Sequence, residues 1–259
     1  MLHIAITAGG TSENMDGIRK ITNVSTGLLG WYCLKAVLHH FNSGADKSYH
    51  VHYLHTENAV KRPLTKDEKK QVTFIPVTDA ASVYKAVDTL TKEIPVDYFI
   101  HSMAIADFTF SYAAAMPELA EELYGFRNCD GENRDDIAAI LENPLCRYNP
   151  DGKISSDSNL IIGLKRTKKV IPLIKKNNPE TFLVGFKLLK GVTEDELISV
   201  ANRMAAVNGC DMVLANDVAL IGKTNHQGIL IKNDTIIDRP RGKEEIAKSI
   251  VRNMLSFSK

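Results

Sequence analysis

The chain begins with a short apolar run, residues 4–7, that ends in a turn of Gly9, Gly10, Thr11 and Ser12. We expect this run to form a buried strand that delivers the turn to one edge of a sheet. Glycines let backbone N–H groups come close to a bound anion, and the two hydroxyls can add hydrogen-bond donors. The turn is therefore a candidate site for phosphate groups.

A second polar segment, with Asn23, Ser25, Thr26 and Gly27, lies just before a predicted helix from Leu28 to His40. The unpaired N–H groups and the dipole at the start of a helix favour negative charge. Two such segments so close together suggest a ligand that carries phosphates. The alternative interpretation is that both are ordinary strand–helix connections with capping residues, and the local pattern leaves it open.

Strand and helix patterns alternate along the chain, which predicts an α/β fold: a Rossmann-like, doubly wound, mostly parallel sheet in a single domain spanning 1–259. Residues 56–70 are predicted to be a loop, and 228–231 with 235–237 a hairpin. We expect strands at 2–7, 49–55, 72–76, 97–102, 159–164, 181–186 and 212–215, and helices at 28–40, 83–90, 170–176, 197–204 and 246–255.

Ligands of doubly wound sheets bind beyond the carboxyl ends of the strands. The turn at Gly9 and the segment 101–107 would then share one crevice. Asp107 emerges there from a stretch of small residues, where its carboxylate could ligate magnesium through water or accept from a substrate N–H. A simple turn-capping role for Asp107 is equally compatible with the pattern.

The segment 108–152 is long and polar, with a weak helical pattern at 116–123. Excursions of this length commonly form a lid or an oligomer contact. We therefore expect 108–152 to serve dimerisation or to cover a site.

Composition excludes several classes of function. The 259 residues carry a net charge of +1, which gives no electrostatic footprint for nucleic acid or an acidic membrane surface. The four cysteines lack metal or disulfide spacing, and no apolar run is long enough to span a bilayer. Histidines gather near 49–55 without carboxylates to frame a metal site. The expected compartment is the cytosol.

Standard nucleotide-binding signatures are missing. The sequence has no P-loop, and Gly9-Gly10 lacks the third glycine of a dinucleotide fingerprint. The missing P-loop argues against a P-loop NTPase, whereas an NAD(P)-dependent reductase would have to use an incomplete fingerprint.

Seven ordered motifs resemble the phosphopantothenoylcysteine synthetase (phosphopantothenate–cysteine ligase) family, in its monofunctional bacterial type. The resemblance covers essentially the whole chain. The motifs are Ile6–Glu13, Ile18–Gly27, Met103–Phe108, Lys153–Ser156, Leu164–Ile171, Val184–Lys187 and Leu214–Asp217.

The resemblance implies a ligase that joins 4′-phosphopantothenate to L-cysteine through an acyl-cytidylate, with CTP as co-substrate (ATP is possible), Mg²⁺ and a homodimer. Asn23 and Lys153 match the catalytic residues: Asn23 bonds the activated carboxyl group, and Lys153 stabilises charge as pyrophosphate leaves. Asp107 matches the residue near nucleotide and metal. The implied nucleotide contacts are Gly9, Gly10, Thr11, Ser12, Asp107, Lys153, Lys168, Lys169, Val170, Ile171 and Phe186. The implied substrate contacts are Asn23, Ser25, Thr26, Gly27, Met103 and Ala104.

Two other functions remain to be weighed against the ligase. One is an NAD(P)-dependent reductase of Rossmann-like fold, and the other is a non-catalytic nucleotide-binding protein. The presence of Asn23, Lys153 and Asp107 together argues against the second, because a decayed site has no reason to retain all three.

Overall fold

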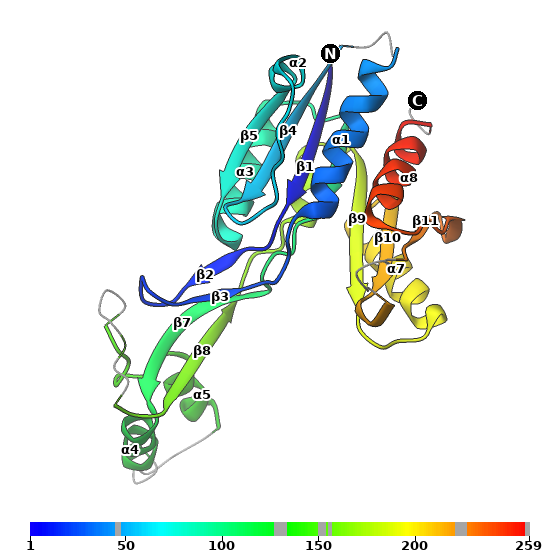
Figure 1. Cartoon of the computed structure of the whole chain (residues 1–259). Helices are drawn as coiled ribbons and strands as arrows, with labels where there is room; N and C mark the ends of the chain where they lie inside the picture. The colour runs from blue at the N-terminus through cyan, green and yellow to red at the C-terminus, as the bar shows by residue number, and fades with distance from the viewer. Residues whose placement is uncertain (45–47, 127–133, 150–153, 155–156, 221–226, 257–259) are drawn as a thin grey trace.

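Eight strands form one twisted sheet in the computed structural model, which describes residues 1–44, 48–126, 134–149, 154, 157–220 and 227–256 (Figure 1). Their order is β12-β11-β10-β9-β6-β1-β4-β5. The strands are β1 (Leu2–Ala8), β4 (Tyr49–Thr56), β5 (Val72–Val77), β6 (Tyr98–His101), β9 (Phe182–Leu189), β10 (Met212–Asp217), β11 (Ile229–Lys232) and β12 (Thr235–Asp238). All pairings from β10 to β5 are parallel, which confirms the predicted doubly wound sheet.

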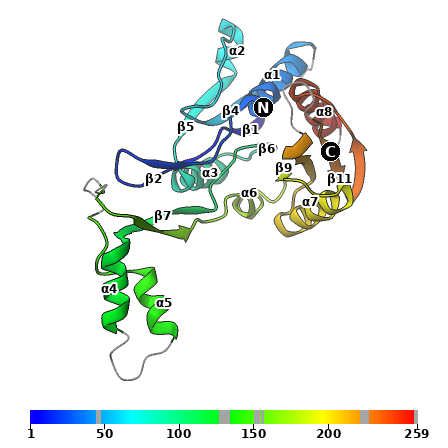
Figure 2. The same ribbon diagram turned by 60° about the horizontal axis from the view of Figure 1, so that its bottom comes forward.

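Helices cover both faces of the sheet (Figures 1 and 2). On one face, α1 (Leu28–Asn42) and α8 (Lys243–Ser256) bury Ile4 and Ile6 of β1 in a shared core. On the other, α3 (Ala80–Glu93) and α6 (Ile171–Asn177) pack over Ala5, and α7 (Glu194–Asn208) packs over β10 and β11. Neighbouring residues of β1 thus serve opposite cores, as the alternation of side chains along a strand requires.

Capping residues fix several helix starts. The Asp79 carboxylate accepts a hydrogen bond from the Ser82 N–H at the start of α3, and Thr193 does the same for Glu196 at α7. The loop predicted at 56–70 is wrong in its last part, where α2 (Lys66–Lys70) forms one helical turn. Thr65 and Glu68 close that turn with a reciprocal capping box.

A small hairpin, β2 (Ser12–Asn14) and β3 (Lys20–Thr22), is inserted between β1 and α1. The sequence predicts only a loop between the first strand and the first helix, so this hairpin was not predicted. Asp16-Gly17 marks the turn, and Gly17 has a φ of +77° that favours glycine. The β1–α1 connection is therefore much longer than the tight turn of a dinucleotide-binding fold.

An arm projects from this body (Figures 1 and 2). It consists of the antiparallel strands β7 (Phe108–Ala115) and β8 (Leu160–Arg166), with α4 (Met116–Phe126) and α5 (Arg134–Glu142) at its far end. The helix predicted at 116–123 is confirmed by α4, whereas β7 and α5 were not predicted. Tyr112, Ala114 and Leu119 make a small core of their own between strands and helices.

Two edge strands close the large sheet, β5 and β12. Pro76 lies within β5, and Pro240 follows β12 by two residues. The β11–β12 turn confirms the predicted hairpin, with Asn233 and Asp234 at φ of 48° and 59°. The 3₁₀ turn η1 (Val218–Leu220) follows β10. Within the described part of the chain, no helix is long and apolar enough to cross a membrane.

Candidate active site

The turn after β1 and the segment after β6 are joined by backbone hydrogen bonds. The Ala104 N–H donates to the Gly9 carbonyl at 2.9 Å, and the Thr11 N–H donates to the Ala104 carbonyl at 3.0 Å. Gly10 and Ala104 also form an isolated parallel bridge. The two segments thus meet at the carboxyl edge of the sheet, as the sequence predicts.

Gly9 and Gly10 permit the close packing of this turn. Gly9 has a φ of +103°, and a Cβ there would collide with the Thr56 hydroxyl at the end of β4. A Cβ on Gly10 would collide with the backbone carbonyl of Asn23. Glycine is required at both positions because the neighbouring chain leaves no room for a side chain.

The Asn23–Gly27 segment lies directly against the glycine turn. The Asn23 N–H donates to the Thr11 carbonyl at 3.0 Å, and the Val60 N–H donates to the Thr26 carbonyl at 2.9 Å. Gly27 caps α1 in a left-handed conformation, with neither a side-chain cap nor an acidic residue in the first turn. The dipole of this 15-residue helix is therefore not compensated locally and favours an anion.

The hydroxyls of Thr11 and Ser12 already have partners in the fold. Thr11 is fully buried and its Oγ1 accepts from the Ala106 N–H at 2.9 Å. The Ser12 hydroxyl lies 3.0 Å from that of Thr22 across the β2–β3 hairpin. Both side chains brace the turn, so the backbone of Gly9 and Gly10 is its most direct means of approaching an anion.

Asp107 and Lys169 form an ion pair of 2.5 Å between Oδ1 and Nζ, with both side chains about two-thirds exposed. Two hydrogen bonds from Thr167, to the carbonyls of Ala106 and Asp107, join the same two segments. Lys168 lies over the Tyr84 ring at 5.4 Å. The predicted metal residue and the predicted nucleotide segment are thus neighbours at the surface.

The remaining predicted contacts are divided between the faces of the sheet. Met103, Val170 and Ile171 pack into the core under α3 and α6, whereas Phe186 packs on the side of α1 and α8. A single ligand could reach Phe186 and Ile171 together only across the carboxyl edge of the sheet. Lys153 lies outside the described residues.

Two buried groups near the crevice were not among the predicted site residues. His101, the last residue of β6, is buried and bonds the Thr7 hydroxyl at 3.1 Å; burial lowers its pKa to about 4, so the ring is neutral. Thr56 buries a hydroxyl beside Gly9 without a partner among the described residues. No sequence pattern marks either residue, because each is defined by what packs against it.

Asp217, at the end of β10, accepts from the N–H groups of Gly191, Val192 and Ala219. These bonds, the one from Gly191 foremost, hold the pKa of its carboxyl below the usual range. The preceding Asn216 is buried, and its Oδ1 has no partner among the described residues. The sequence motif marks the pair, but only the structure separates the satisfied carboxylate from the unsatisfied amide.

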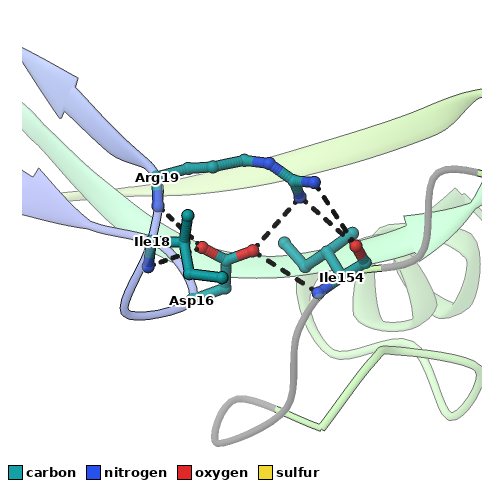
Figure 3. A network of polar contacts seen from close by, with 4 residues as sticks. All are labelled: Asp16, Ile18, Arg19 and Ile154. Carbon is teal, nitrogen blue, oxygen red and sulfur yellow. Dashed lines mark hydrogen bonds and ion pairs between the residues drawn. The ribbon is translucent and has the colours of Figure 1, made fainter.

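Asp16 and Arg19 were not predicted to act together. Asp16 lies at the tip of the β2–β3 hairpin and reaches the backbone of Ile154, the residue after Lys153, as does Arg19 (Figure 3). The Asp-Gly pair at residues 16–17 is a hairpin signal that could have placed Asp16 at such a tip.

Comparison with known proteins now gives a family. The profile for the DNA/pantothenate metabolism flavoprotein C-terminal domain matches residues 1–116 and 146–257. The chain belongs to this family. The match omits residues 117–145, which include nearly all of α4 and all of α5 at the end of the arm.

Relatives of this flavoprotein C-terminal domain family agree in fold. A Streptococcus pneumoniae crystal structure titled DNA/Pantothenate Metabolism Flavoprotein superposes with a TM-score of 0.79, at 28% identity over 100% of both chains. A Cab2 variant in complex with phosphopantothenate-cysteine has a TM-score of 0.64, at 16% identity over 98% of this chain and 85% of its own.

The coenzyme A biosynthesis bifunctional protein CoaBC of Thermococcus kodakarensis is 26% identical over 248 residues, which are 95% of this chain and 49% of the relative. The chain spans about half the length of the curated relatives it matches. The similarity to these relatives therefore covers nearly all of this chain but only about half of each relative.

Proposed function

We propose that the protein is a nucleotide-dependent ligase that joins 4′-phosphopantothenate and L-cysteine into 4′-phosphopantothenoylcysteine, a step of coenzyme A biosynthesis. The observation that carries the proposal is the packing of the Asn23 segment on the glycine turn beside Ala104, in a chain of this family. Two features of its relatives support it: the name of CoaBC and the phosphopantothenate-cysteine complex of Cab2.

In the proposed first half-reaction, a carboxylate oxygen of 4′-phosphopantothenate attacks the α-phosphorus of CTP. A P–O bond forms, the bond to the leaving pyrophosphate breaks, and an acyl-cytidylate results. Two anions must meet for this step, so the site needs hydrogen-bond donors and positive charge. We assign these to the backbone of Gly9 and Gly10, the start of α1, Lys153 and Lys169.

In the second half-reaction, the amine of cysteine attacks the acyl carbon, CMP leaves with the bonding electrons, and the amine loses a proton. The Asn23 side chain would hold the acyl carbonyl during this attack. Its N–H bond to Thr11 and the tight fit against Gly10 fix the backbone from which that side chain extends. Such pre-organisation lowers the cost of orienting the reactants.

Magnesium and the identity of the nucleotide are part of the proposal. Mg²⁺ is usually held by one or two carboxylates together with substrate phosphates. Asp107 offers one exposed carboxylate at the edge of the crevice, which fits such a site once Lys169 turns to a phosphate. Among the described residues there is no cluster of three or more His, Cys, Asp or Glu able to hold a metal alone. The bound ion would neutralise the charge of the triphosphate.

We further propose a homodimer formed through the arm. Four large apolar side chains on β7 and β8 are between 37% and 50% exposed: Phe108, Ile161, Ile162 and Leu164. Ile162 and Leu164 lie on one face of β8, whereas Ile161 lies on the other. Exposed apolar side chains on a projecting two-stranded arm are typical of an interaction surface. The cytosol is the proposed compartment for this reaction.

The reductase alternative is disfavoured by the β2–β3 hairpin. A dinucleotide fingerprint places its pyrophosphate on a tight turn that runs straight from the first strand into a helix. Here the hairpin separates β1 from α1.

The test is pyrophosphate release from 4′-phosphopantothenate and Mg²⁺, with CTP and ATP supplied separately, without and with L-cysteine. Sustained release that requires cysteine and prefers CTP is expected. Folded protein that releases no pyrophosphate with either nucleotide would overturn the proposal.

Asn23→Asp sharpens this test, because it puts a negative charge beside the activated carboxyl group. We expect turnover to fall by roughly 10²–10³-fold. The control is Asn233→Asp, at an exposed position of positive φ that aspartate also tolerates. Equal turnover of the two variants would remove Asn23 from the mechanism.

A further inference from the structure

The loop between β4 and α2 packs against the glycine turn and against the start of α1. The Val60 N–H donates to the Thr26 carbonyl at 2.9 Å. Ala59 is buried, and a Cβ added to Gly9 or to Gly27 would lie 3.2 or 2.9 Å from the Ala59 Cβ. The loop is therefore in contact with both segments to which we assign phosphate binding.

Lys61 comes next in this loop and is exposed. Its Nζ lies 3.4 Å from Nδ1 of His55, the last residue but one of β4. His55 is paired in register with Ala8, the last residue of β1, and neighbouring strands are about 4.8 Å apart. The Lys61 ammonium group thus lies at the carboxyl edge of the sheet, next to the turn that begins at Gly9.

The charge of Lys61 is not neutralised by a carboxylate in the part of the chain that the structure describes, although Glu57 is exposed in the same loop. By contrast, Lys70 and Lys92 each face a carboxylate, at 2.8 and 2.7 Å. The His55 ring is neutral at pH 7, because burial lowers its pKa. The positive charge of Lys61 is therefore available to a bound anion.

Arg62 attaches the same loop to α1. Its guanidinium carbon lies 5.6 Å from the centre of the Tyr32 ring, in the second turn of the helix. A cation over an aromatic face is attracted by the negative charge of the ring. This contact holds the backbone next to Lys61 close to the helix.

Thr56, the last residue of β4, adds an unsatisfied hydroxyl at the same place. It is 4% exposed, and its Oγ1 has no partner among the described residues. The oxygen faces Gly9, where an added Cβ would lie 2.0 Å from it. A buried hydroxyl without a hydrogen bond is costly, and a ligand oxygen beside Gly9 would give it a partner. The hydroxyl, the start of α1 and the Lys61 ammonium group all border the glycine turn.

We propose that Lys61 binds a phosphate group of a substrate between the glycine turn and the start of α1. The inference deepens the proposed ligase function and rests on it. Two proposed substrates carry phosphates: CTP has its triphosphate, and 4′-phosphopantothenate has its 4′-phosphate. A lysine ammonium group recognises either of them as a point charge.

Two substitutions separate the charge of residue 61 from its size. Lys61→Gln removes the charge and keeps most of the side chain, whereas Lys61→Arg keeps the charge. The matched control is Lys85→Gln on α3, since Lys85 is also exposed and forms no ion pair within the described ranges. Because both positions are exposed, the melting temperature should stay near wild type in all three variants.

The loss of one charged hydrogen bond should weaken phosphate binding by about 10–100-fold. If Lys61 binds the 4′-phosphate, Lys61→Gln should raise the KM for 4′-phosphopantothenate by this factor and leave the KM for CTP unchanged. If it binds the triphosphate, the KM for CTP should rise instead. Two unchanged KM values in Lys61→Gln, or an equal loss in Lys61→Arg or Lys85→Gln, would overturn the proposal.

Calorimetry with CTP and Mg²⁺, and separately with 4′-phosphopantothenate, tests the contact apart from the reaction. One of the two Kd values should rise by about 10-fold or more in Lys61→Gln and stay near wild type in Lys85→Gln. Two unchanged Kd values overturn the contact, even when the enzyme is active. Wild-type protein that binds these ligands but releases no pyrophosphate instead overturns the proposed function, so the two failures are distinguishable.

Discussion

The body and the arm differ in how far they bury their apolar side chains. In the body, helices cover both faces of the parallel sheet, and most apolar side chains of its central strands are buried within the chain. In the arm, one small core around Tyr112 and Leu119 serves two strands and two helices, and several apolar side chains on β7 and β8 remain about half exposed. The arm is therefore the region that we propose as the surface for a second copy.

A glycine-to-alanine substitution should have its most different effects in the body and in the arm. Gly10→Ala in the body would drive a Cβ into the Asn23 carbonyl, whereas Gly125→Ala in α4 of the arm meets nothing within 4 Å. We expect Gly10→Ala to abolish activity and to cost about 1–3 kcal/mol of unfolding free energy. Gly125→Ala should stabilise α4 by up to about 1 kcal/mol. Urea unfolding and pyrophosphate release check both; a Gly10→Ala enzyme with wild-type turnover would contradict the tight packing.

A charge on the arm should break the proposed dimer without unfolding the body. Ile162→Lys removes an apolar contact worth about 1.5–3 kcal/mol if it is buried between two copies. That corresponds to roughly a 10–100-fold weaker dimer. Sedimentation at several concentrations measures this, with Val207→Lys on α7, 76% exposed in the body, as the control. If the wild-type protein sediments as a monomer at all concentrations, the proposed dimer is wrong.

Acid should act on the body through its buried histidines. Burial lowers the pKa of His101 to about 4, and burial with the neighbouring His50 and His3 lowers that of His52 to about 4. Between their usual pKa of 6.5 and about 4, the unfolded chain binds protons that the folded chain does not. Stability should therefore be retained above pH 6.5 and fall as the pH drops through this window, by up to about 1.4 kcal/mol per pH unit for each ring.

The measurement is urea unfolding at about pH 7 and about pH 5, with His101→Gln beside wild type. The variant should show the shallower pH dependence. Identical slopes would mean that His101 does not stay neutral in the folded protein.

Lys169→Gln gives the smallest expected change in stability. The ion pair with Asp107 is exposed, so its loss should alter the unfolding free energy by less than about 1 kcal/mol. If Lys169 also contacts a phosphate, the KM for CTP should rise well beyond that small effect. An unchanged KM would show that Lys169 does not contact the nucleotide and only pairs with Asp107 at the surface.

The sequence predicted the body well because its signals are local. The strand at Leu2–Ala8, the cap at Asp79 and the hairpin at Asn233-Asp234 each follow from a few neighbouring residues. The meeting of Gly9 with Ala104 followed from a general rule of parallel sheets. The family resemblance added the candidate roles of individual residues.

The arm and the contact of Asp16 with Ile154 could not be predicted in the same way. Phe108, Phe110 and Tyr112 do alternate with polar residues, which is a local strand signal for β7. Nothing local, however, pairs β7 with β8 about 50 residues later, or Asp16 with Ile154. Likewise, the partners that occupy the Thr11 and Ser12 hydroxyls are known only from the folded chain.

The two ends of the sheet also bear on how the protein avoids aggregation. An edge strand with free backbone groups invites a second chain to extend the sheet, and proline lacks the N–H that such growth requires. Pro76 in β5 and Pro240 just after β12 place that obstacle at or beside both ends of the body. These prolines make the two edges poorer templates for a second chain than edges without proline would be.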